Sequence, residues 1–278
     1  MENIKEKVFD GGTSMSVNGY ADSLSSNLVL SESDKQNIRT SISTLRSKLN
    51  FYFNDIEVMF EFGSYTRGTI LPRKVDRNSD IDFMIVFKND DSFKPQTYLS
   101  RLKKFAEKYY HSSEIFQSTP TIVLSLNHIK FELVPAYSLT TLWSKSYYIP
   151  APRNNFEEWI QTKPNEFNEL LTKKNVNEKG NIKPMIRLAK YWNAEQNHVF
   201  LSYSMEEYIV NHIYSYYTKT IFDYFAEFVL SLSTNSLSQT SRTKVESLQK
   251  RITEIINLKA QGHENIAEEK LKKILPSV

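Results

Sequence analysis

Cysteine is absent from this chain of 278 residues, and glycine occurs at only seven positions. The lack of cysteine excludes disulfides, cysteine-ligated zinc and a thiol nucleophile. The scarcity of glycine argues against a glycine-rich dinucleotide-binding fold. Residues 1–12 lack the apolar core of a signal peptide, and no apolar run approaches the roughly 20 residues that span a bilayer. We therefore expect a soluble, cytoplasmic protein with no membrane partner.

A large excess of one charge is also missing, because 35 basic residues face 32 acidic residues and leave a formal net charge of +3. This balance gives no strong basic field of the kind that dominates duplex binding, so we do not expect a long nucleic acid to be required. Apolar residues make up 40% of the chain, which is enough for a substantial core. The length allows one large domain or two lobes that share a cleft.

Hydrophobic periodicity predicts an α+β fold, with helix and strand patterns segregated along the chain. Residues 1–30 are polar and irregular and are expected to form an N-terminal arm. Residues 31–53 have helical periodicity, with Ser33 and Gln36 at the spacing of a capping box. The apolar face of this helix carries four residues, Ile38, Ile42, Leu45 and Leu49.

Strand patterns follow this helix. Four segments alternate or are continuously apolar, namely 56–62, 80–87, 121–127 and 129–138. The second is apolar almost throughout, which is typical of a central strand. Residues 98–110 predict an amphipathic helix, whereas residues 143–164 contain prolines and are expected to be irregular.

Beyond residue 165 the strand patterns stop. The remaining segments have helical patterns, namely 166–175, 182–196, 205–232, 242–261 and 264–275. We therefore predict a mixed-sheet lobe over residues 31–164 and a helical lobe over residues 165–278, with the active site in the cleft between them.

Asp80 and Asp82 stand two residues apart at the start of a predicted strand, so both carboxylates point to the same side. Two carboxylates held together repel, and a cation between them removes that repulsion. Mg²⁺ suits this position because it prefers a few carboxylates together with substrate phosphates. An isolated pair of this kind is more often a solvated turn, so the neighbouring motifs decide its meaning.

Gly63 and Ser64 follow a predicted strand sixteen residues before Asp80. Glycine lets a phosphate approach the backbone closely, and successive N–H groups in such a turn attract anions. Glu132 supplies a third acid inside an otherwise apolar strand, where a carboxylate needs a partner. If that strand lies beside the strand of Asp82, three carboxylates can hold two metal ions about 4 Å apart. The alternative is that Glu132 pairs with a nearby lysine or arginine.

The stretches FEFGSYTRGT, RNSDIDFMIVF and FELVPA together resemble the signature of the DNA polymerase β nucleotidyltransferase superfamily. Within it, the chain most resembles the bacterial cGAS/DncV-like nucleotidyltransferases, which make cyclic oligonucleotide second messengers in anti-phage signalling. The resemblance implies a polymerase-β-like sheet lobe with Asp80, Asp82 and Glu132 as its catalytic, metal-binding acids. Many relatives have aspartate where this chain has Glu132, a difference of one methylene group.

The helical lobe extends the resemblance. The segment RLAKYWN resembles the family helix that carries a triphosphate-binding lysine, which corresponds to Lys190. The segment LSYSMEE resembles the one in which a serine contacts the triphosphate and the next aromatic residue stacks on the base, which gives Ser202 and Tyr203. The residue pattern alone leaves two alternatives open. Lys183, Arg187 and Lys190 could form a solvated basic face, and Tyr203 could belong to the core.

The resemblance implies an enzyme with two Mg²⁺ ions, replaceable by Mn²⁺, and with nucleoside triphosphates as substrates, ATP among them. Its product would be a cyclic di- or oligonucleotide sensed by a neighbouring effector protein. Two other hypotheses stay open: transfer of the nucleotide to RNA, a protein or a small molecule, and a catalytically inactive relative used for binding. The presence of all three acids argues against the inactive relative.

Overall fold

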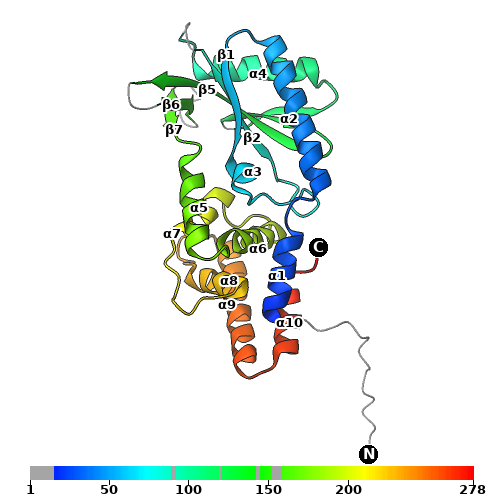
Figure 1. Ribbon diagram of the computed structural model, residues 1–278, viewed down its shortest axis with the longest axis vertical. Helices are drawn as coiled ribbons and strands as arrows, with labels where there is room; N and C mark the ends of the chain where they lie inside the picture. Colours follow the sequence, from blue (N-terminus) through cyan, green and yellow to red (C-terminus); the bar gives the residue numbers. More distant parts are fainter. Residues whose placement is uncertain (1–15, 89–91, 119, 142–144, 152–157) are drawn as a thin grey trace, which may run out of the picture.

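The computed structural model describes residues 16–88, 92–118, 120–141, 145–151 and 158–278. Over these ranges the chain forms a sheet lobe and a helical lobe, stacked along the long axis of the molecule (Figure 1). Each lobe has its own hydrophobic core. The α+β arrangement expected from the sequence is confirmed, and the exact division of the chain near residue 164 stays a prediction.

The described strands form one mixed sheet. They are β1 (Ile56–Phe62), β2 (Ile81–Phe87), β3 (Glu114–Ser118), β4 (Thr121–Ser125), β5 (Lys130–Thr140), β6 (Lys145–Pro150) and β7 (Trp159–Thr162). Their order is β1-β2-β5-β4-β3, and β6 and β7 extend the sheet from the last part of β5. The pair β2 and β5 is parallel, and the other pairs are antiparallel. β2 is therefore an interior strand, as its apolar sequence predicted.

One face of this sheet is covered by helices α2 (Glu32–Tyr52) and α4 (Pro95–Tyr109). The predicted apolar face of α2 packs there, with Leu45 and Leu49 fully buried. Phe83 and Phe87 of β2 enter the same core. Because side chains alternate along a strand, Asp82 lies on the other face of the sheet. The alternation thus places Asp82 on the face opposite the helix-covered core, where it lines the cavity described below.

The helical lobe is built around α6 (Ile182–Glu195), which is buried along most of its length. The helices that surround it are α1 (Val17–Asn27), α5 (Glu166–Asn177), α7 (Ser202–Asn211), α8 (Ile221–Ser231), α9 (Gln239–Ala260) and α10 (Glu264–Lys272). Trp192 on α6 is only 4% exposed and belongs to this core. No helix among the described residues is both long and apolar enough to cross a bilayer.

The expectation of an N-terminal arm is wrong from residue 16 onward. Residues 17–27 form helix α1, which packs beside α10 in the helical lobe (Figure 1). Val17, Tyr20 and Leu24 are buried in the helical core, and the Tyr20 hydroxyl donates a hydrogen bond to the Leu275 carbonyl at 2.6 Å. The spacing of three to four between these apolar residues is a helical signal that the polar neighbours obscured. Residues 1–15 lie outside the described part.

Three local expectations also differ from the structure. The capping box of α2 is formed by Ser31 and Asp34, two residues before the predicted pair Ser33 and Gln36. The segment 143–164, expected to be irregular, contains β6 and β7, although 143–144 and 152–157 lie outside the described residues. The helical pattern over 205–232 is divided into α7 and α8 by an intervening loop.

Candidate active site

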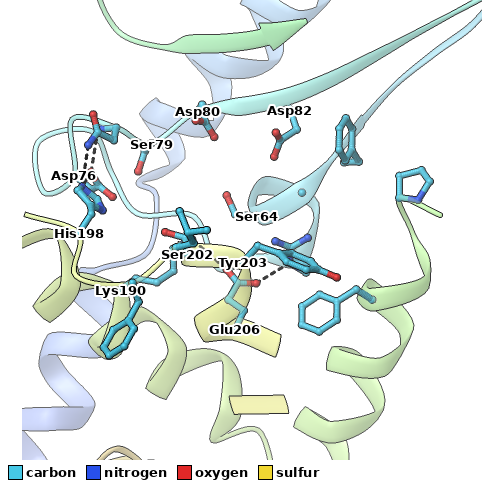
Figure 2. Close-up of a pocket in the computed structure, with 18 of the residues that line it drawn as sticks. Ser64, Asp76, Ser79, Asp80, Asp82, Lys190, His198, Ser202, Tyr203 and Glu206 are labelled. Carbon is cyan, nitrogen blue, oxygen red and sulfur yellow. Dashed lines mark hydrogen bonds and ion pairs between the residues drawn. The ribbon is translucent and has the colours of Figure 1, made fainter. Parts of the chain in front are cut away.

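A cavity of about 520 Å³ lies between the two lobes (Figure 2). Seven of the eight predicted site residues line it, namely Gly63, Ser64, Asp80, Asp82, Lys190, Ser202 and Tyr203. The eighth, Glu132, lies on the strand beside Asp82. Figure 2 shows the two aspartates on one side of the cavity, the helical-lobe residues on the other, and Ser64 between them. Neither lobe alone therefore contains the site.

The three acids converge on one face of the sheet, as predicted. Asp82 and Glu132 are direct cross-strand partners in the parallel pair of β2 and β5. Burial, together with the charges of Asp80 and Glu132, raises the pKa of Asp82 to about 8. Burial and the neighbouring Asp80 likewise raise the pKa of Glu132 to about 7. Nearby cations therefore do not fully compensate the charged forms of these carboxyl groups.

The backbone at Gly63 explains why glycine precedes Ser64. Gly63 has a φ of +72°, a region that favours glycine, and it begins the short helix α3 (Gly63–Arg67). A Cβ atom at this position would lie 1.8 Å from Oδ2 of Asp82. Because Gly63 has no side chain, the Asp82 carboxylate can occupy the space beside it. This packing role differs from the one that the sequence predicted for Gly63, the close approach of a phosphate.

Lys130 lies beside the acids on β5. Its Nζ is 3.2 Å from Oδ2 of Asp80 and 4.0 Å from Oε1 of Glu132. The alternative considered for Glu132, pairing with a nearby basic residue, thus describes a real contact. It does not separate Glu132 from the aspartates, because the same ammonium group also pairs with Asp80.

A buried ionic cluster forms the opposite wall of the cavity. Glu206 of α7 is 0% exposed and accepts from Arg67 at 2.8 Å, from the Thr69 hydroxyl at 2.9 Å and from Lys190 at 3.2 Å. Burial alone would raise the pKa of Glu206, but the charges of Lys190 and Arg67 lower it below its ordinary value. Two cations against one acid leave a positive charge beside the cavity. Arg67 and Glu206 were not predicted as site residues, although both lie in the quoted motifs.

The three basic residues of α6 do not form a solvated face. Lys190 is buried at 6% exposure. Arg187 is also buried, and its guanidinium donates to the carbonyls of Ser25 and Gly68. Arg187 therefore joins α1 and the sheet lobe to α6, which is a structural task. Of the predicted basic stripe, Lys190 is the residue that lines the cavity.

Ser202 is the first residue of helix α7, as predicted for a hydroxyl that meets a phosphate. Tyr203 follows it and is 51% exposed, so it is not a core residue. Its ring centroid is 5.2 Å from that of Phe167, and the Arg67 guanidinium lies 5.9 Å from it. The exposed ring at the edge of the cavity is available for stacking.

The loop between α6 and α7, for which the sequence predicted no role, contributes His198 and Phe200 to the lining of the cavity. His198 has a φ of +54° and lies in this loop, which the Asn193 side chain holds through hydrogen bonds to both backbone groups of Phe200. Nε2 of His198 is 2.9 Å from Nδ2 of the Asn78 side chain and 3.4 Å from Oδ1 of Asp76. These contacts cross from one lobe to the other. A single histidine without a partner motif gave no sequence signal for them.

Asp80, Asp82 and Glu132 are the residues that could hold a divalent cation. Among the residues that the structure describes, no three acidic or histidine side chains are already arranged to hold a metal ion. Mg²⁺ rarely uses such a complete protein cage, because it takes one or two carboxylates plus substrate phosphates. The donor set and its incompletely compensated charge therefore fit a divalent cation, to which a phosphorylated substrate would add further ligands.

The fold and the site can be compared with known proteins. Residues 15–175 match the Second Messenger Oligonucleotide or Dinucleotide Synthetase (SMODS) domain. A probable cyclic nucleotide synthase of Bacillus cereus strain VD146 is 30% identical over an alignment of 172 residues, which covers 57% of this chain and 50% of that protein. The chain thus spans about half the length of this curated relative.

Solved structures of bacterial enzymes share the fold. CdnC of E. coli MS115-1 with ATP has a TM-score of 0.66 and 14% identity, over 94% of this chain and 98% of that one. CdnG of Bradyrhizobium diazoefficiens in complex with GTP has a TM-score of 0.66 and 10% identity, over 93% and 98%. The SMODS match covers more than half of the chain. The chain therefore belongs to the SMODS family, with the fold of the bacterial cGAS/DncV-like nucleotidyltransferases.

Proposed function

We propose that this protein is a nucleotidyltransferase that joins nucleoside triphosphates into a cyclic di- or oligonucleotide, with Mg²⁺ as its cofactor. The register of Asp82 with Glu132, beside Asp80 and opposite Lys190 and Ser202, carries this proposal. It puts an acidic wall and a basic wall on either side of one cavity. A triphosphate with bound cations has the charges that such a cavity complements.

The donor nucleotide would occupy the cavity between the lobes. Ser64, Lys190 and Ser202 all line it and would bind the triphosphate, through two hydroxyl groups and one ammonium. The base would stack on the exposed ring of Tyr203. Gly63 contributes by leaving the Asp82 carboxylate its position beside the phosphate-binding turn. ATP is expected among the substrates, and the ATP and GTP complexes of the structural relatives support this class.

The reaction is an in-line displacement. A ribose hydroxyl of the acceptor attacks the α-phosphorus, the bond to the β-phosphate breaks, and pyrophosphate leaves with the electron pair. Asp80, Asp82 and Glu132 would hold two Mg²⁺ ions, which when bound neutralise the phosphates and favour loss of the hydroxyl proton. The protein itself aligns the two nucleotides and excludes other geometries. A second attack by the linear product would close the ring.

The biological setting belongs to the same proposal. The family description and the curated relative support a second-messenger product. We propose that a neighbouring effector protein senses this product in defence against phage, and that the enzyme acts in the cytoplasm without a long nucleic acid. The boundary between the lobes near residue 164 remains a prediction.

The proposal is tested by incubating the pure protein with labelled nucleoside triphosphates and Mg²⁺, followed by phosphatase treatment and mass spectrometry. A phosphatase-resistant product whose mass fits a cyclic species is expected. Label found on RNA or protein, or in a linear product alone, would reject cyclisation and favour a different acceptor. A matched reaction with Asp82→Asn should give no product.

A further inference from the structure

Lys130 touches the acidic site but is not needed to bind the donor nucleotide in the proposal above. Its ammonium lies 3.2 Å from Asp80 and 4.0 Å from Glu132, and its side chain is 19% exposed. It stands two residues before Glu132 on β5, so both side chains are on the same face of the sheet. The cavity is lined by Lys130 as well. The residue is thus held against two of the three acids.

The charges around the site explain this placement. Three carboxylates repel one another, and an ammonium between two of them offsets part of that repulsion. The other nearby cations, Arg67 and Lys190, are paired with Glu206 across the cavity. A divalent ion bound by Asp80 and Glu132 would bring its charge to the place that the Lys130 ammonium now fills. Like charges a few ångströms apart repel, so the two cations compete for this position.

We propose that Lys130 is a built-in counter-ion of the acidic site, which holds Asp80 and Glu132 while no divalent cation is bound and leaves Asp80 when one binds. This inference rests on the proposed function, because it takes the acids as the metal site. Lys130 is then a positioning residue that sets the concentration of divalent cation at which the site fills. Its ammonium offsets the repulsion between Asp80 and Glu132 and competes with a divalent cation for them.

The test compares Mn²⁺ binding by the wild-type protein and by Lys130→Met, measured without nucleotide from the electron paramagnetic resonance signal of free Mn²⁺. Methionine keeps an unbranched stem of similar length and removes the charge. We expect the variant to bind Mn²⁺ about tenfold more tightly, since a unit charge beside a divalent ion is removed. Equal or weaker binding by the variant, or no binding by either protein, would overturn the inference.

Two further variants act as controls. Lys130→Arg keeps the positive charge and should stay within about twofold of wild type. Lys163→Met removes another lysine that lines the cavity but pairs with Glu166 at 3.0 Å, and it should leave the affinity unchanged. An equal gain in affinity for Lys163→Met would indicate a general charge effect and would count against a specific counter-ion.

A second readout separates this inference from the proposed function. In EDTA the Lys130→Met variant should melt at a lower temperature than wild type, and Mn²⁺ should raise its melting temperature by more. Asp82→Asn should lose most Mn²⁺ binding if the acids are the metal site. Unchanged binding by Asp82→Asn would therefore contradict the proposed function, whereas unchanged binding by Lys130→Met alone contradicts only the counter-ion.

Discussion

The two walls of the cavity handle charge in opposite ways. On the sheet side, Asp82 and Glu132 have raised pKa values because nearby cations offset only part of the burial and of the repulsion among the acids. On the helical side, Glu206 has a lowered pKa because Lys190 and Arg67 offset its burial. The basic wall thus has an internal counter-ion that holds its two cations in place, whereas the acidic wall carries a charge that a bound cation would offset. Uncompensated charge in a cleft is a mark of a functional site.

Removing an acid should have the largest effect on catalysis. Asp82→Ala is expected to lower kcat of the nucleotidyl transfer by about ten-thousandfold, in line with other catalytic carboxylates. Because the charge removed is one of three that repel, the melting temperature in EDTA should not fall. Steady-state kinetics and thermal melts measure the two quantities. A variant that keeps a tenth of the activity would show that the acidic wall is not the reaction centre.

Removing the acid of the opposite wall should act on stability. Glu206→Ala leaves Arg67 and Lys190 buried without a counter-charge, which typically costs about 3–5 kcal/mol of unfolding free energy. Urea denaturation measures this loss. Glu207→Ala removes the neighbouring exposed acid and should change stability by less than about 0.5 kcal/mol. Equal effects of the two changes would show that Glu206 does not act as the counter-ion of the two buried cations.

The glycine beneath Asp82 provides a test of geometry. Gly63→Ala puts a Cβ where Oδ2 of Asp82 lies, and a displacement of about 1 Å can cost a hundredfold in rate. Gly68→Ala is a matched control, since Gly68 has a nearly equal φ of +71° but nothing within 4 Å of the added atom. It should show backbone strain of about 1 kcal/mol and near-normal activity. Similar kinetics for both variants would mean that strain, rather than the carboxylate, explains Gly63.

Base stacking should have a smaller effect. Tyr203→Ala removes an exposed ring beside the cavity, and base–aromatic stacking is worth about 1–3 kcal/mol. We expect KM for the donor nucleotide to rise roughly tenfold with a smaller change in kcat. Tyr216→Ala removes a tyrosine that is 90% exposed and does not line the cavity, so its KM should be normal. An unchanged KM for Tyr203→Ala would leave this ring without a binding role.

The stability of the metal-free protein should depend on pH through the two buried acids of the site. The pKa of Asp82 is raised from 3.8 to about 8 and that of Glu132 from 4.5 to about 7. At a pH between the ordinary and the raised pKa of each acid, the unfolded chain has lost a proton that the folded chain keeps. The free energy of unfolding in EDTA should therefore fall as pH rises from 5 to 8. A decline of a few degrees in melting temperature is expected. Asp82→Asn and Glu132→Gln combined should flatten it, and a flat wild-type profile would contradict the shifts.

The parts of the fold that sequence could predict are those with strong periodicity. The apolar face of α2, the interior position of β2 and the shared face of Asp82 and Glu132 follow from spacings of 3.6 or 2 residues. Helix α1 was missed because its apolar residues are separated by serine, asparagine and aspartate, and their partners lie far along the chain on α10. Strands β6 and β7 were missed because the prolines of this segment indicated breaks in regular structure.

Only the site residues that lie in recognisable sequence motifs could be predicted. Ser64, Asp80 and Lys190 stood in recognisable patterns, and the structure lines one cavity with them. The partner of Lys190 could not be read from the sequence, because Glu206 is sixteen residues away and its burial depends on how two helices pack. The contact between Lys130 and Asp80 depends in the same way on which strands pair.

The cluster around Glu206 also has a mechanical meaning. Arg67 and Thr69 belong to the sheet lobe and Glu206 to the helical lobe, so two buried contacts, the Arg67–Glu206 ion pair and the Thr69–Glu206 hydrogen bond, join the lobes at the floor of the cavity. A hinge motion that admits a nucleotide would keep this floor as its pivot and widen the mouth. Substrates would then enter, and a ring-closed product would leave, without breaking the fastening that holds the two halves in register.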